Sequence, residues 1–231
     1  MRQNIGLHYK NMVKENLNKI LGDMPDNVQL ICVSKFHSIE DILEAYNEGQ
    51  RDFGESRVQE LLQKQPALPQ DIRWHFIGPL QTNKIKQIVP FISMIQSIEN
   101  MRQIEEIQKC ATKIDKKINV LLEVHIAQEK QKHGFLYEEI IDFFSNRIYE
   151  QYPNIEVCGI MTIATLTDSE AQISEEFARS RDIFEKIKNI YPNPSFKELS
   201  IGMSDDYRLA IANGSTMVRI GSKIFGAREY K

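Results

Sequence analysis

The sequence predicts a (β/α)8 barrel, in which parallel strands alternate with helices that cover the sheet. Eight short β-type runs alternate with longer runs of helical periodicity, which is the pattern of a parallel sheet with helical crossovers. The runs LICV, INVLLEV and VCGIMTI are largely apolar, as expected for strands that are buried on both faces. No GxGxxG motif follows the first strand, which weighs against an open doubly wound sheet.

An amphipathic helix opens the chain, and the alternating elements follow it. Ile5 to Leu21 places apolar side chains on one helical face and ends at Gly22. The expected strands are Leu30 to Val33, Arg51 to Glu55, Trp74 to Gly78, Met94 to Ile98, Val120 to Ile126, Val157 to Ile163, Leu199 to Met203 and Met217 to Gly221. The expected helices between them are Ser38 to Gly49, Arg57 to Lys64, Gln81 to Val89, Asn100 to Lys116, Tyr137 to Arg147, Ser169 to Ile190 and Asp205 to Asn213. Ser38 and Asp41 form a capping-box pattern.

Composition and charge are typical of one soluble domain. The chain has 231 residues, 42% of them apolar, with 29 basic and 32 acidic side chains and a formal charge of −3. We therefore expect a single domain over residues 1–231. No basic patch for nucleic acid or for a membrane surface is visible, and neither an export signal nor a membrane span is expected. Cys32, Cys110 and Cys158 match no disulfide or metal spacing, which predicts reduced thiols in a cytoplasmic protein.

Candidate functional residues collect where the strands end, because the carboxyl-terminal face of such a barrel carries its chemistry. Lys35 directly follows LICVS. Partial burial at that point lowers the pKa of a lysine and allows its amine to attack a carbonyl and form a Schiff base. On this residue alone, an ordinary surface lysine at a strand end is the simpler interpretation.

The seventh and eighth strands predict a phosphate site, because barrels often bind phosphate there with backbone N–H groups at a helix N-terminus. Ser204 precedes one helix, and Gly221 and Ser222 precede a last helical turn. The structural alternative is that Ser204 is only an N-cap and Gly221 only a tight turn. Arg219 lies in the apolar strand VRIGS, so we expect it to meet an anionic side chain or a ligand heteroatom.

Other reactive side chains carry less information. The five histidines match no metal-ligand spacing, so no metal site is expected. Ser34 and Cys32 lack the partners of a hydrolase triad. Met161 and Trp74 are most simply core or pocket wall.

Six segments then carry a family resemblance from Leu30 onward. They are VSKFHSIEDILEAYNEGQRDFGES, WHFIGPLQTNK, KHGF, GIMTI, LSIGMSDDYRLAI and MVRIGSKIFGAR. In this order they resemble the YggS/PROSC family of pyridoxal 5′-phosphate (PLP) homeostasis proteins. The resemblance implies a barrel of the alanine racemase N-terminal-domain type that binds PLP and takes part in intracellular PLP homeostasis, without turnover of its own.

The resemblance also implies roles for individual residues. The implied cofactor-binding residues are Lys35, Met161, Ser204, Arg219, Gly221 and Ser222. Lys35 forms the Schiff base with PLP, and Arg219 hydrogen-bonds the pyridine nitrogen. Ser204, Gly221 and Ser222 hold the phosphate. Met161 lies along the PLP ring. An arginine at that nitrogen keeps it unprotonated and makes PLP a weak electron sink, which disfavours carbanion chemistry.

Three positions depart from the family pattern. Ser56 and His125 each stand where the family commonly has asparagine, and Ala164 stands where proline is frequent. Ser56 leaves in doubt the cofactor contact that the family's asparagine makes, because the shorter serine side chain reaches the same contact only through water. The histidine leaves one pocket position undefined, and the alanine loosens a loop.

Three functions remain open at this stage. The first is a monomeric PLP carrier without catalysis, whose partners are PLP and PLP-dependent client enzymes. The second is a PLP-dependent amino-acid racemase, which needs an acid or base on each ring face. In alanine racemase the second base comes from an additional domain, which we do not expect in this chain. The third is a Schiff-base aldolase or phosphosugar enzyme that uses the same lysine without PLP.

Overall fold

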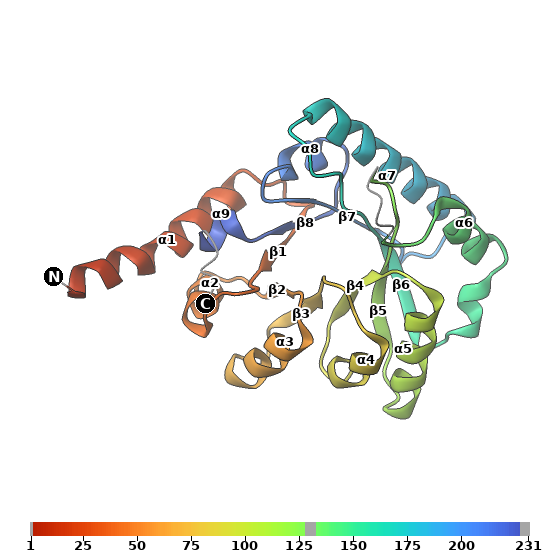
Figure 1. Ribbon diagram of the computed structural model, residues 1–231, viewed down its shortest axis with the longest axis horizontal. Coiled ribbons are helices and arrows are strands. Elements are labelled where there is room, and N and C mark those ends of the chain that lie inside the picture. The colour runs from red at the N-terminus through yellow and green to blue at the C-terminus, as the bar shows by residue number, and fades with distance from the viewer. Residues whose placement is uncertain (1, 128–132, 227–231) are drawn as a thin grey trace.

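The computed structural model describes residues 2–127 and 133–226, and within these residues eight parallel strands close into a barrel (Figure 1). The strands are β1 (Gln29–Val33), β2 (Asp52–Glu55), β3 (Arg73–Phe76), β4 (Met94–Ile98), β5 (Ile118–Glu123), β6 (Ile155–Met161), β7 (Glu198–Met203) and β8 (Met217–Ile220). The strand order runs from β1 to β8, and β8 pairs with β1. The predicted (β/α)8 barrel is confirmed.

Helices follow the strands and lie outside the barrel (Figure 1). They are α1 (Arg2–Gly22), α2 (Ile39–Asn47), α3 (Val58–Lys64), α4 (Thr82–Ile88), α5 (Met101–Lys113), α6 (Tyr137–Ser145), α7 (Glu170–Ile190), α8 (Tyr207–Ala212) and α9 (Ser222–Phe225), with short 3-10 turns at Gln65–Ala67 and Ile148–Gln151. The capping box of α2 is confirmed, because the Asp41 N–H donates to Ser38 Oγ and the Ser38 N–H donates to Asp41 Oδ2, each over 3.1 Å. In the described residues no helix is both long and apolar enough to cross a membrane.

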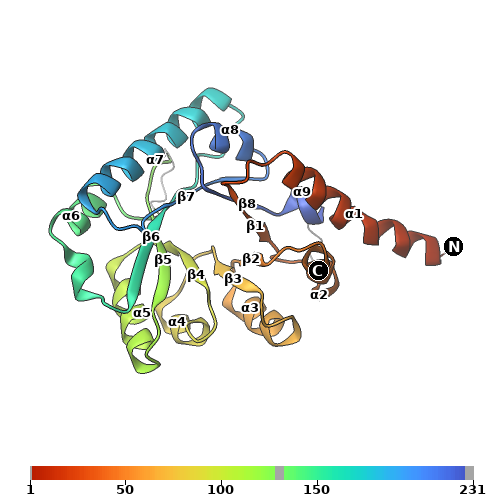
Figure 2. The same ribbon diagram turned by 180° about the vertical axis from the view of Figure 1, so that it is seen from behind.

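The opening helix α1 lies beside α2 and α9, as Figure 2 shows from behind. Its buried side chains are Val13, Leu17 and Ile20, and Asn16 Nδ2 donates to the carbonyl oxygen of Ile224 over 3.1 Å. Leu21 was expected on the buried face but is 40% exposed, since the helix ends one residue later. The side chains of Ile5 and Tyr9, Lys132 of the KHGF segment, and Ala227 and Arg228 of the last segment lie outside the described residues.

Strand side chains alternate between the inside of the barrel and the layer of helices, as the period of a β-strand requires. The outward residues join the helices in the main core. The interior holds a separate apolar cluster formed by Ile31, Met94, Leu121, Cys158, Met161 and Met217. Polar side chains at the matching inward positions are also buried; they are His75, Gln96, Ser200 and Arg219. The interior is therefore a mixed apolar and polar core.

An extra residue in β6 shifts its register against β5, so that Val120 pairs with Val157 but Leu121 pairs with Gly159. Gly159 has a φ of +157°, and a Cβ at this position would lie 1.8 Å from the carbonyl oxygen of Glu198 in β7. Only a residue without a side chain lets β6 and β7 approach this closely. The bulge thus sets which side chains of β6 face the barrel interior, up to its last residue, Met161.

Gly159→Ala is expected to lower the free energy of unfolding by about 3 kcal/mol, because the added methyl group collides with backbone rather than with a movable side chain. Urea denaturation measures the change. Gly22→Ala is the matched control, since a Cβ there meets nothing within 4 Å. We expect the control to stay within about 0.5 kcal/mol of the parent protein. Equal stability of the two variants would contradict the proposed role of the bulge.

Candidate functional site

Closure of the barrel brings Lys35 and Gly221 to the same edge. Cys32 pairs with Ile220 in the β1–β8 ladder, Lys35 follows three residues after Cys32, and Gly221 comes directly after Ile220. A Cβ on Gly221 would lie 3.0 Å from the carbonyl oxygen of Val33. The glycine therefore allows the end of β8 to lie against the end of β1.

The loops after β7 and β8 are joined by a direct hydrogen bond. The N–H of Gly221 donates to Ser204 Oγ over 3.2 Å. The alternative that Ser204 is only an N-cap is wrong, because Asp206 occupies the N-cap position of α8 and makes no side-chain cap there. Ser222 is exposed and is the first residue of α9. These three residues of the predicted phosphate site thus lie together, while their binding of phosphate remains a prediction.

Arg219 is buried inside the barrel and donates to uncharged oxygens. Its Nη1 donates to the carbonyl oxygen and to Oγ of Ser200 over 2.8 and 2.7 Å, and its Nη2 donates to the carbonyl oxygen of Thr162 over 3.0 Å. The expected ion pair is not formed among the described residues. Burial lowers the pKa of Arg219 to about 10, against the opposing effect of Glu123 and Asp206, so the guanidinium is a cation at neutral pH.

The remaining donors of Arg219 suit a ligand. A guanidinium carries five N–H groups, and the bonds within the described residues use three of them. Met161 ends β6 and is 1% exposed, and it pairs with Ser200 in the β6–β7 ladder. The structure thus places Met161 beside the residue that binds Arg219. Whether either side chain contacts a cofactor stays a prediction.

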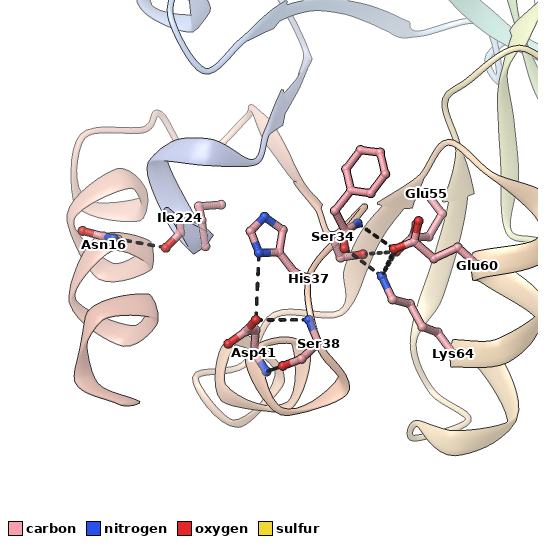
Figure 3. A network of polar contacts seen from close by, with 10 residues as sticks. Asn16, Ser34, His37, Ser38, Asp41, Glu55, Glu60, Lys64 and Ile224 are labelled. Carbon is pink, nitrogen blue, oxygen red and sulfur yellow. Dashed lines mark hydrogen bonds and ion pairs between the residues drawn. The ribbon is translucent and has the colours of Figure 1, made fainter. Parts of the chain in front are cut away.

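A buried network holds the residues on both sides of Lys35 (Figure 3). Lys64 Nζ donates to the carbonyl oxygen of Ser34 over 2.8 Å, to Glu55 Oε1 over 2.8 Å and to Glu60 Oε1 over 2.6 Å. Ser34 Oγ also donates to Glu55 Oε1 over 2.7 Å. The backbone that leads into Lys35 is therefore anchored to the end of β2 and to α3.

The residue after Lys35 is held in an uncommon conformation. Phe36 has a φ of +68°, which is costly for a bulky side chain. Its N–H donates to Glu60 Oε1 over 2.6 Å, and the guanidinium of Arg57 lies 4.7 Å from the centre of its ring. The next ring, His37, stacks on Phe225 of α9 with centroids 4.8 Å apart. The loop that carries Lys35 thus contacts both α3 and α9.

Sequence reasoning missed Lys64. Its side chain is 8% exposed, and it lies on the same face of α3 as Val58 and Leu61, which are buried. A lysine in phase with the apolar positions of a short helix was the available signal. Glu55 is the last residue of the predicted second strand, and the structure shows that its Oε2 is buried without a hydrogen-bond partner in the described residues. Burial raises the pKa of Glu55 to about 7, and the ammonium of Lys64 partly opposes this.

A second group of titratable side chains lies beside a cavity of about 170 Å³ at the ends of β3, β5 and β6. His133 Nδ1 lies 3.2 Å from Glu99 Oε2. Burial and the charge of Glu99 raise the pKa of Glu123 to about 7. His125 and Ala164, two of the three positions that depart from the family pattern, line this cavity. The third, Ser56, lies at the end of β2, where a Cβ on Gly78 would lie 2.5 Å from its carbonyl oxygen.

Comparison with known proteins assigns the family. The family model described as "Alanine racemase, N-terminal domain" matches residues 10–229. The pyridoxal phosphate homeostasis protein of Pasteurella multocida is 37% identical over 208 residues, with 88% of each chain covered. That of Synechocystis is 38% identical over 214 residues, with 91% of this chain and 96% of the relative covered. The chain belongs to the pyridoxal phosphate homeostasis protein family. The resemblance to the YggS/PROSC family is confirmed.

Solved structures agree with this family. PipY of Synechococcus elongatus, solved without PLP, superposes with a TM-score of 0.88 at 33% identity and covers 93% of this chain and 100% of its own. The same protein with PLP bound gives a TM-score of 0.84 at 32% identity, with the same coverage. Alanine racemase from E. faecalis matches with a TM-score of 0.70 at 14% identity, over 94% of this chain and 58% of its own. At that identity the similarity shows the fold alone.

Glu55→Gln is expected to change how stability depends on pH. The folded parent protein holds a proton on Glu55 up to about pH 7, whereas the unfolded chain loses it near 4.5. The parent should therefore gain stability relative to the variant as the pH falls from 7 towards 5, by up to about 1.4 kcal/mol per pH unit, and the difference should level off below 4.5.

Urea denaturation at several pH values measures this difference. Glu175→Gln, which removes a 76% exposed carboxylate from α7, is the control and should leave the pH profile unchanged. A difference that stays constant between pH 5 and 8 would rule out a raised pKa at Glu55.

Proposed function

We propose that this chain binds PLP at the carboxyl-terminal face of the barrel and holds it as part of intracellular PLP homeostasis. The observation that carries the proposal is that closure of the β1–β8 ladder brings Lys35 and the joined Ser204 and Gly221 to one edge. Two kinds of relative support it, namely curated proteins named for PLP homeostasis and a solved relative that contains PLP. The N–H groups of Arg219 that make no hydrogen bond within the described residues also fit a heteroaromatic acceptor.

Each proposed residue acts on a different part of the ligand. PLP supplies an aldehyde and an electron-withdrawing ring when it is bound. Lys35 would supply the amine that bonds to the aldehyde carbon, with the aldehyde oxygen leaving as water. The Ser222 N–H at the start of α9 and the hydroxyls of Ser204 and Ser222 would hold the phosphate, and Gly221, which has no side chain, would leave room for it. Met161 covers one side of the ring.

Arg219 favours holding PLP over turnover. A guanidinium with a pKa of about 10 remains protonated at neutral pH and donates to the ring nitrogen, which therefore stays unprotonated. A ring held unprotonated by Arg219 would withdraw electrons weakly and would therefore give little help to carbanion chemistry. We therefore propose a binding role without catalysis. Loss of α-deuterium from an amino acid in the presence of the loaded protein would contradict it.

We also propose that the protein acts as a cytoplasmic monomer that supplies PLP to PLP-dependent enzymes. Three unpaired, buried cysteines support a reducing compartment. A binding site without catalysis suits transfer, because the Schiff base forms and hydrolyses reversibly.

Lys35→Ala is expected to abolish covalent attachment of PLP while leaving weaker, non-covalent binding through the phosphate. Absorbance spectra with and without added PLP, followed by borohydride reduction and peptide mass mapping, measure the attachment. Lys86→Ala, an exposed lysine of α4, should behave like the parent protein. A reduced adduct that persists at another lysine in Lys35→Ala would show that the wrong residue was chosen, and a parent protein that never becomes coloured would overturn the proposed function.

Ser222→Asp is expected to weaken PLP affinity by roughly tenfold or more, because the new carboxylate faces the phosphate. Titration of PLP by absorbance gives the affinity. Ser169→Asp adds the same charge at the N-cap of α7, where aspartate caps as well as serine, and should leave the affinity unchanged. Equal affinities in the two variants would place the phosphate elsewhere.

A further inference from the structure

A chain of hydrogen bonds crosses the barrel interior from Arg219 to Asp52. Arg219 Nη1 lies 2.7 Å from Ser200 Oγ, and Ser200 Oγ lies 2.7 Å from Gln96 Oε1. Gln96 Nε2 lies 3.0 Å from His75 Nδ1, and His75 Nε2 lies 3.2 Å from Asp52 Oδ1. The residues belong to β8, β7, β4, β3 and β2, so the contact between Gln96 and Ser200 joins two strands, β4 and β7, that are not neighbours in the sheet.

The far end of the chain is an anion. Arg73 donates from Nε to Asp52 Oδ1 over 2.7 Å and from Nη2 to Asp52 Oδ2 over 2.6 Å. Burial raises the pKa of Asp52, but the hydrogen bonds from Arg73 and His75 outweigh it and hold the pKa well below its ordinary value. A carboxylate accepts only. His75 therefore donates from Nε2, and in its neutral form its Nδ1 is an acceptor.

The hydrogen bonds made by Gln96 and Ser200, in the middle of the hydrogen-bond chain, also have a defined donor direction. Gln96 Nε2 faces two acceptors, since Met217 Sδ lies 3.1 Å from it in addition to His75 Nδ1. A thioether has no hydrogen to donate. If the Gln96 amide were flipped, its oxygen would face Met217 Sδ and would receive no hydrogen bond from it. Gln96 Oε1 accordingly accepts from the hydroxyl of Ser200, and Ser200 Oγ accepts from Arg219. With His75 in its neutral form, every donor from Arg219 to Asp52 points the same way.

Burying this chain of polar side chains inside the barrel has a free-energy cost that apolar side chains would avoid. Gln96 and Ser200 are fully buried, and His75 and Arg219 are 3% and 5% exposed. Methionine and leucine fill neighbouring interior positions without any polar group to satisfy. A buried polar group costs free energy unless it is hydrogen-bonded, and packing alone does not require one. What the chain adds is a defined orientation and a strengthened acceptor for Arg219, because Ser200 Oγ accepts better when its own hydrogen is donated onward.

We propose that Ser200, Gln96 and His75 are positioning residues that hold Arg219 ready to donate to the ring nitrogen of the bound cofactor. This inference rests on the proposed function. Opposite charges at Arg219 and Asp52 polarise the chain and maintain its direction. Without Ser200 Oγ, one N–H of Arg219 loses its acceptor, and the guanidinium can turn away from the ligand.

The first test uses the protein without PLP. Nitrogen-15 NMR of the histidine side chains should show His75 as the neutral tautomer with its proton on Nε2. Gln96→Glu replaces the amide donor by a carboxylate, so His75 should then carry protons on both nitrogens between two carboxylates. A proton on Nδ1 of His75 in the parent protein at neutral pH, or a His75 signal unchanged in Gln96→Glu, would overturn the inferred direction.

The second test measures ligand binding by calorimetry with 4-deoxypyridoxine 5′-phosphate, which keeps the ring nitrogen and phosphate but has no aldehyde for Lys35. Ser200→Ala should weaken its binding by about tenfold, which corresponds to about 1.4 kcal/mol. Ser200→Thr, which keeps the hydroxyl, should restore most of the affinity. Binding of inorganic phosphate alone should be the same in all three proteins, because it does not use Arg219.

A matched control separates this effect from general damage to the core. Ser215→Ala removes another buried serine hydroxyl, whose hydrogen-bond contacts within the described residues are backbone carbonyl oxygens of β7 and β8, and should not change the affinity for the pyridine probe. If the parent protein does not bind the probe, the proposed function fails. If the parent binds it and Ser200→Ala binds it equally well, the positioning role fails while the proposed function stands. If Gln96→Glu does not fold, the comparison of Ser200→Ala with Ser200→Thr still tests the positioning role.

Discussion

The pairing of β8 with β1 is the constraint on which the candidate site depends. The ladder from Gln29 with Met217 to Cys32 with Ile220 closes the sheet, and only closure places the loop after the first strand beside the loop after the last. Gly221 makes the approach possible, because any side chain there would meet the backbone of Val33. An open sheet with the same elements would leave Lys35 and Ser222 at opposite edges. The (β/α)8 fold is thus a condition for the site as well as its scaffold.

Two buried polar systems support the site from different sides. Lys64 and its carboxylate partners anchor the backbone before and after Lys35. The interior chain that ends at Asp52 anchors Arg219. Each system satisfies polar groups that would otherwise destabilise the core, and each limits the movement of one functional side chain. Lys35 and Arg219 are therefore pre-arranged relative to a barrel whose own packing is otherwise apolar.

Much of the fold was predictable because its signals are local. Alternation of apolar runs and helical periodicity identified the strands, and Ser38 with Asp41 marked the start of α2 as the structure confirms. The boundaries of β5 and β6 were misplaced towards the carboxyl end. Val124 forms a bridge to Phe135 beyond the barrel, and the extra residue before Gly159 shifts β6. Neither effect has a local sequence signature, because both depend on which residue a strand meets across the sheet.

The sequence by itself determined the barrel and the family, and it placed the candidate site residues at strand ends, because hydrophobic period and ordered motifs are properties of the chain alone. Tertiary structure decided which groups meet. It showed that Arg219 bonds to neutral oxygens, that Ser204 accepts from Gly221 instead of capping α8, and that Lys64 is buried beside Glu55. It also assembled Asp52, His75, Gln96 and Ser200 into one chain. These contacts join residues on separate strands, so their partners and donor directions follow only from three-dimensional packing and the requirement that buried polar groups be satisfied.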